Sequence, residues 1–178
     1  MAHLLRSLLG LFIAICTLAA PVSASLTSDS YDGNIYALYA GNGSLVPPAT
    51  TLQESQAAGR TSILVFYLDD SSTSKAFSPV VSELQRLWGR SVDLMPMTTD
   101  ALQGRKPTGN DDPAKYWHGR IPQVVVLDGQ GNVELDQDGQ VPLEAINAAV
   151  SKATGIPAPE GVSTSLSFNE LNTEVQTR

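Results

Sequence analysis

Cysteine is almost absent from this sequence of 178 residues, in which Cys16 is the only one. Small exported proteins often depend on disulfides, but a single cysteine excludes one within the chain. Histidine is also scarce, and of the two only His118 lies beyond the first residues, so a zinc or copper site would lack ligands. We therefore expect no metal and no cofactor, and a stability that comes from buried apolar surface.

Two pairs of adjacent carboxylates, Asp69-Asp70 and Asp111-Asp112, are the other candidates for binding a cation. Neither pair has the ligand spacing of a known calcium loop. We interpret all four residues as helix caps or solvated loop residues.

Positive charge is in short supply. The chain carries 11 Lys and Arg against 18 Asp and Glu, which gives a net charge of −7. Nucleic acids need clustered Lys and Arg to neutralise their phosphates, and an anionic membrane surface attracts the same side chains. We therefore expect no nucleic-acid partner and at most a peripheral association with membranes.

The N-terminal segment has the pattern of an export signal. An apolar run at 8–20 follows the basic residue Arg6, and it is shorter than the about 20 residues that a membrane-spanning helix needs. The small residues at 22–24 match what a signal peptidase reads. We expect residues 1–24 to be a signal peptide that is cleaved before Ser25, with a retained anchor as the alternative, and the protein to be exported.

The following sequence alternates strand-like and helix-like segments. Apolar runs predict buried strands at 62–68, 92–97 and 123–127. Alternating polarity predicts further strands at 35–40 and 132–136, the second of them in a hairpin with 123–127. Apolar residues at helical spacing predict helices at 51–58, at 72–88 and from Pro142 onward. This order predicts an α/β domain over residues 25–154, with a central mixed β-sheet flanked by helices.

The C-terminal residues 155–178 have the composition of a linker and tail, because Pro157 and Pro159 lie at their start. Ser167 and Glu170 have the spacing of a capping box, which predicts a short helix that docks onto this domain or onto another protein. A disordered tail is the alternative, because so short a helix is marginal alone.

Residues 66–79 resemble the segment of thioredoxins in which an apolar strand leads into W-C-x-x-C-K and a proline-containing helix. In this register Ser71 and Ser74 occupy the two cysteine positions, Asp70 replaces the tryptophan, and Lys75 matches the lysine. Thiol–disulfide exchange needs a thiolate and a second, resolving thiol. Since a serine hydroxyl can supply neither, we predict no thiol–disulfide oxidoreductase activity.

A second segment, 119–126, resembles the Gly-x-Ile-Pro-Thr segment of the same family, whose proline has a cis peptide bond and faces the redox pair. The match places Ile121 and Pro122 at this position, after an insertion around 103–112. The resemblance spans about 35–154 and implies a thioredoxin-like three-layer sandwich. The sequence is also generally similar to exported thioredoxin-like proteins of photosynthetic bacteria, which implies the thylakoid lumen or the periplasm as its location.

The resemblance also implies a peptide-binding groove beside the proline, in which a partner pairs by its main chain. The residues expected to form it are Asp70, Trp117, Arg120, Ile121 and Pro122. We therefore predict a redox-inactive protein that binds a protein or peptide partner, for example an assembly, stability or chaperone-like factor. A solvated loop with Trp117 packed under it is the alternative interpretation of this surface.

An enzyme that uses the groove with a hydroxyl nucleophile or a bound small molecule is the alternative function. A serine nucleophile needs a base within hydrogen-bond reach and a group that orients the base. His118 is the histidine available for Ser71, whereas capping of the following helix explains Ser71 without catalysis. A hydrogen bond between Ser71 and His118 would support the enzyme.

Overall fold

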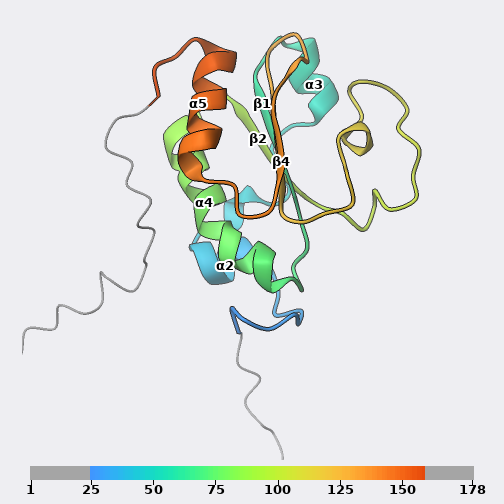
Figure 1. The fold of residues 1–178 in the computed structure, drawn as a ribbon, viewed down its shortest axis with the longest axis vertical. Coiled ribbons are helices and arrows are strands. Elements are labelled where there is room, and N and C mark those ends of the chain that lie inside the picture. Colours follow the sequence, from blue (N-terminus) through green and yellow to red (C-terminus); the bar gives the residue numbers. More distant parts are fainter. Residues whose placement is uncertain (1–24, 159–178) are drawn as a thin grey trace, which may run out of the picture.

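The computed structural model describes residues 25–158. Its elements follow the order α2 (Ile35–Ala40), η1 (Gly43–Leu45), α3 (Leu52–Ala57), β1 (Ser62–Tyr67), α4 (Ser72–Trp88), β2 (Asp93–Thr98), η2 (Pro113–Lys115), β3 (Gln123–Leu127), β4 (Val133–Asp138) and α5 (Leu143–Thr154). Helices α4 and α5 cover one face of the sheet, and α3 with the loop 99–122 covers the other (Figure 1).

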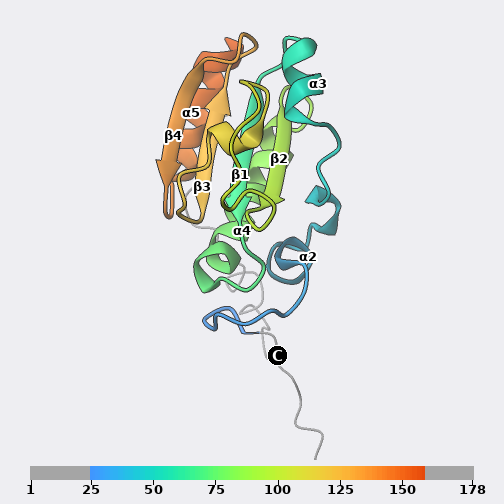
Figure 2. The same ribbon diagram turned by 90° about the vertical axis from the view of Figure 1, so that its right-hand side faces the viewer.

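The four-stranded sheet has the order β2-β1-β3-β4 (Figure 2). Strand β1 pairs in parallel with β2 and antiparallel with β3, and β3 pairs antiparallel with β4. All of β1 is buried because it is central and both of its faces are covered. The mixed α/β sandwich that the sequence predicted is therefore confirmed.

The sheet separates two apolar clusters. From β1, Ile63, Val65 and Tyr67 face the cluster formed with α2, α4 and α5. Leu64 and Phe66 face the second cluster, which lies under α3 and the loop 99–122. Because strand side chains alternate between faces, one continuous apolar strand supplies both clusters.

The strand predicted at 35–40 is wrong, because these residues form helix α2. Asn34 caps it: its side-chain oxygen accepts the N–H groups of Tyr36 at 2.9 Å and Ala37 at 3.3 Å. Gly41 ends the helix with a φ of 62°, a left-handed conformation that glycine adopts without strain. A stretch of only six residues can fit both the two-residue period of a strand and the 3.6-residue period of a helix. The caps at Asn34 and Gly41 favour the helix.

Strand β2 ends the sheet on one side. The amides of Asp93 and Thr99 donate to carbonyls of Thr61 and Tyr67, on the β1 side. Backbone groups alternate in direction along a strand, so Pro96 lies on the outward-facing backbone, and proline has no N–H to donate there. Pro96 is buried.

The other predicted elements lie within about two residues of those observed, and the Ile121–Pro122 peptide bond is cis. The signal peptide and the tail helix fall outside the described residues, and the domain boundaries at 24 and 154 stay predictions. Within residues 25–158, every helix is too short or too polar to cross a bilayer.

Candidate functional site

Ser71 and Ser74, which the sequence resemblance aligns with two cysteines, hold the start of α4 in place. Ser71 is the N-cap of α4, and its Oγ accepts the N–H of Ser74 at 3.4 Å. Ser74 is only 2% exposed, and its Oγ accepts the N–H of Leu68 at 3.3 Å. The first helical amide, that of Ser72, donates to Asp29 Oδ1 at 2.7 Å. Both hydroxyls thus accept structural hydrogen bonds at the point where β1 leads into α4.

Lys75, one residue further, is fully buried. Its Nζ donates to Asp32 Oδ2 at 2.5 Å and to three backbone carbonyls, those of Ser25 at 3.2 Å, Ser28 at 2.9 Å and Ser30 at 2.7 Å. The bond from Lys75 holds the pKa of Asp32 well below its usual value. A buried ammonium is stable only when its donors are satisfied, so Lys75 fixes the segment 25–32 against the first turn of α4.

Pro122 lies at the same end of the molecule as the tip of α4. Gln123 pairs with Phe66 near the end of β1, which places Pro122 beside the last residue of that strand. The carbonyl of Pro122 accepts the N–H of Gly139 at 2.7 Å. The next residue, Gln140, donates from Nε2 to the carbonyl of Thr73 at 2.8 Å. The loop after β4 therefore connects Pro122 with the first turn of α4.

The other residues predicted for the groove spread in different directions. Trp117 is half-buried beside the second cluster, with its ring 5.5 Å from that of Phe66. Arg120 is 79% exposed, and its Nη1 lies 3.4 Å from Asp138 Oδ2. Asp70 lines a small hollow of about 150 Å³ together with Tyr31, Leu68, Asp69, Thr98 and Asp100. The structure thus places Pro122 near the tip of α4, while Trp117 packs under the loop 99–122.

His118 is oriented toward β4. Its Nε2 lies 3.1 Å from Asp136 Oδ2, and its side chain is 56% exposed. Ser71 Oγ instead shares a hydrogen bond of 2.9 Å with Thr73 Oγ1. Among the hydrogen bonds of residues 25–158 there is none between Ser71 and His118, so this geometry lends no support to a serine nucleophile.

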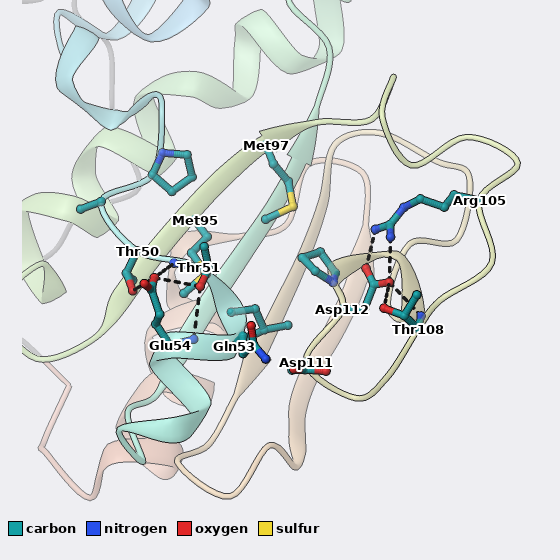
Figure 3. Close-up of a pocket in the computed structure, with 14 residues that line it drawn as sticks. Thr50, Thr51, Gln53, Glu54, Met95, Met97, Arg105, Thr108, Asp111 and Asp112 are labelled. Carbon is teal, nitrogen blue, oxygen red and sulfur yellow. Dashed lines mark hydrogen bonds and ion pairs between the residues drawn. The ribbon is translucent and has the colours of Figure 1, made fainter.

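A larger hollow, which we call the β2 hollow, opens on the face of the sheet opposite α4. It has a volume of about 630 Å³ and lies between segment 48–54, strand β2 and segment 105–113. Figure 3 shows Met95 and Met97 between the two walls. The opening exists because α3 has only six residues and irregular chain covers the rest of this face.

One wall of the β2 hollow is organised by Asp112, which is 6% exposed. Its carboxylate accepts hydrogen bonds from both terminal nitrogens of Arg105. It also accepts hydrogen bonds from the backbone N–H and the hydroxyl of Thr108, both at 2.9 Å (Figure 3). Burial alone would raise the pKa of Asp112, but these hydrogen bonds outweigh it and hold the pKa well below its usual value. The Asp112 carboxylate forms an ion pair with Arg105, and the bonds to Arg105 and Thr108 hold this part of the loop in one shape.

The opposite wall is the N-terminus of α3, which carries a capping box. Thr51 Oγ1 accepts the N–H of Glu54 at 3.2 Å, and the Glu54 carboxylate accepts the N–H of Thr51 at 2.9 Å. The backbone bond from Thr51 lowers the pKa of Glu54, which keeps the carboxylate ionised at this edge of the hollow.

Both walls are therefore fixed by local hydrogen bonds, and the floor between them carries thioether and aliphatic side chains from Met95, Met97 and Leu52. An apolar floor with a few polar groups at its rim is typical of sites that bind organic groups or side chains, and the volume lies in the range of such sites. In residues 25–158 no group of three or more His, Cys, Asp or Glu side chains is placed to hold a metal ion.

Sequence reasoning missed the β2 hollow and the segment 25–32. The hollow joins three segments that are distant in sequence, and the one available signal was the pair Met95 and Met97, whose spacing puts both on one face of a strand. The segment 25–32 binds Lys75 mainly through backbone carbonyls, which leave no trace in a side-chain pattern.

No protein-family model matches the chain. The chain is 37% identical over 155 residues to the thylakoid membrane protein slr1796 of Synechocystis sp., an alignment that covers 85% of this chain and 77% of that protein. The chain belongs to the family of this protein.

Two solved structures are distantly similar to this chain. A redox protein from Chlamydomonas reinhardtii has a TM-score of 0.44 and 16% sequence identity, and the match covers 82% of this chain but only 42% of that one. An HIV epitope scaffold has a TM-score of 0.33 and 16% identity, over 66% of this chain and 70% of its own.

Proposed function

We propose that this protein is a redox-inactive, thioredoxin-like protein of the thylakoid that binds a protein or peptide partner, as an assembly, stability or chaperone-like factor does. The observation that supports the proposal is the state of the α4 tip. Ser71 and Ser74 stand where thiols would be needed, and both hydroxyls accept structural hydrogen bonds. The tip of α4 has a strand, a cap and a helix in the order that thioredoxins have, but its two serines cannot exchange electrons.

The location rests on two independent observations. The Synechocystis relative is named as a thylakoid membrane protein, and residues 1–24 have the pattern of an export signal. Together they favour the lumenal side of the thylakoid membrane, with a peripheral association at most.

The loop 99–122 supports binding because it contributes to both candidate surfaces. It carries Trp117 and Arg120 beside Pro122, and it forms the Asp112 wall of the β2 hollow. Trp117 and Met97 both flank the second apolar cluster. We propose that a partner segment lies along this loop and places an apolar side chain against Met97 in the hollow. Aromatic residues and arginine are enriched where interfaces gain most of their affinity.

The test of redox inactivity is a disulfide-reduction assay on the chain that begins at Ser25. We expect no turnover above buffer. The matched variant S71C/S74C should form an intramolecular disulfide, because Ser71 is the extended N-cap residue and its side chain reaches Ser74, whose N–H it accepts at 3.4 Å. Turnover by the unmodified chain would overturn the proposal.

The test of binding is affinity capture from native thylakoid membranes with the W117A/R120A variant. We expect the captured partners to be lost. The matched control is L38A/R90A, which removes one exposed apolar side chain and one exposed arginine elsewhere on the surface. Circular dichroism must show both variants folded. Equal capture by W117A/R120A and the unmodified chain would contradict binding through this loop.

A further inference from the structure

Within the segment 25–32, one side-chain carboxylate, that of Asp32, accepts hydrogen bonds from three different groups. Asp32 Oδ2 accepts hydrogen bonds from Lys75 Nζ at 2.5 Å, from the hydroxyl of Tyr39 at 2.7 Å and from the backbone nitrogen of Ser25 at 3.3 Å. The Asp32 side chain is 5% exposed and that of Lys75 is fully buried. The Ser25 nitrogen therefore lies beside the ion pair of Asp32 and Lys75, at a partly buried position.

We propose that the α-amino group released by cleavage before Ser25 is a structural ligand, which pairs with Asp32 and locks residues 25–32 over the tip of α4. This inference rests on the predicted cleavage and goes beyond the proposed function in partner binding. In an uncleaved chain the same nitrogen is an uncharged amide. After cleavage it is an ammonium, whose positive charge adds Coulomb attraction to the hydrogen bond that the amide already donates to the Asp32 carboxylate.

The charges around this nitrogen favour the ammonium. Two carboxylates, Asp29 and Asp32, lie beside one cation, Lys75, and Coulomb attraction from Lys75 also reaches Asp29. Without a free amine the cluster carries an excess negative charge, and the Ser25 ammonium balances it. Burial, together with its bond to Asp32, raises the pKa of Tyr39 to about 12, so Tyr39 stays neutral.

Locking the segment has a consequence for the tip of α4. Asp29, within the segment, takes up the first amide of the helix through its bond to Ser72, and Lys75 binds the carbonyls of Ser25, Ser28 and Ser30. Processing thus strengthens the cover over the tip and leaves the β2 hollow, on another side of the molecule, open. The uncleaved precursor would have the same fold, with a weaker contact between the Ser25 nitrogen and Asp32, a contact that we call the latch.

The experiment compares the chain 25–178 with a free Ser25 amine and the same chain acetylated at that amine. At pH 6.5 the free amine should raise the midpoint of thermal unfolding by about 2–4 °C. The pKa of an α-amino group is about 7.7–8.0 in an unfolded chain, and pairing with Asp32 raises it in the folded state. The added stability is therefore complete below about pH 7.5 and is lost as the pH rises through the folded value. At pH 10.5 the two chains should unfold at the same temperature.

The variant Asp32→Asn supplies the control, because it removes the anion and should abolish the difference at pH 6.5. Lys75, Asp29 and Tyr39 are common to both chains and cancel from the comparison. Equal midpoints at pH 6.5, or a difference that persists at pH 10.5 or in Asp32→Asn, would overturn the latch. If Asp32→Asn does not fold, the pKa of the Ser25 amine measured by NMR decides, since an amine pKa that is not raised contradicts it.

The N-terminus of the protein isolated from its native membranes, determined by mass spectrometry, tests the cleavage separately. A start at Ser25 supports the proposal, and any other start refutes the role of processing. Neither result bears on partner capture through Trp117 and Arg120, so failure of the latch and failure of the proposed function are distinguishable.

Discussion

The indole N–H of Trp88, in α4, donates to Asn147 Oδ1, in α5, at 2.8 Å, and both side chains are buried. This bond joins the two helices that cover the same face of the sheet. A buried indole N–H needs an acceptor, because it has lost its water.

Asn147→Ala should therefore lower the free energy of unfolding by about 1–3 kcal/mol. Chemical denaturation measures the change. In a double-mutant cycle with Trp88→Phe, the loss caused by Asn147→Ala should become smaller, since the donor is gone. Additive losses would mean that the bond contributes nothing.

Gln123 connects the loop 99–122 to the sheet. Its Nε2 donates to the carbonyl of Tyr116 at 2.6 Å and to Asp136 Oδ1 at 2.8 Å, and its Oε1 accepts the N–H of His118 at 3.1 Å. Gln123→Ala should cost about 2–3 kcal/mol of stability. Amide hydrogen exchange should accelerate first at residues 116–118, while that of α5 stays slow at low denaturant. Uniform acceleration across the domain would contradict a local role.

Asp112 should make the β2 hollow sensitive to acid but not to changes near neutrality. Its pKa is held well below the usual value, so its stabilising bonds are complete above about pH 4, the ordinary carboxyl range, and are lost as the pH falls through its folded value. Asp112→Asn should destabilise the protein by a constant amount between pH 5 and pH 8. The difference should shrink below about pH 4, as measured by thermal unfolding at each pH. A difference that varies around pH 7 would contradict this assignment.

Ser71 and Ser74 should contribute unequally to stability. Ser74→Ala leaves the amide of Leu68 without its acceptor and should cost about 1–2 kcal/mol. Ser71→Ala removes a longer capping bond, at 3.4 Å, and should cost about 0.5–1 kcal/mol. Denaturant titrations of the two variants give both values, and a larger loss from Ser71→Ala would refute this order.

The sheet could be predicted because its strands have a distinct pattern. Strand β1 is apolar after its first residue, Ser62, and β3 and β4 are separated by a glycine-containing turn. Helix α2 could not be recognised from six residues of alternating polarity, although Asn34 and Gly41 mark its two ends. Capping residues therefore carried the information that the periodicity lacked.

The site was less predictable. Ser71 was correctly interpreted as a helix cap, but Asp112, expected to be a cap or a solvated loop residue, is a cap that is also buried under bonds from Arg105 and Thr108. No local pattern distinguishes a carboxylate on a loop surface from one around which the loop folds. The burial of Asp112 depends on the path of the loop, which brings Arg105 and Thr108 back to its carboxylate.

The proline in the outermost strand has a consequence for how copies of this protein meet. At Pro96 the outward-facing backbone of β2 has no hydrogen to offer, so a strand from a neighbouring molecule cannot form a continuous ladder along this border. Amyloid-like stacking through β2 is thereby interrupted at its midpoint, even at a high concentration of the protein.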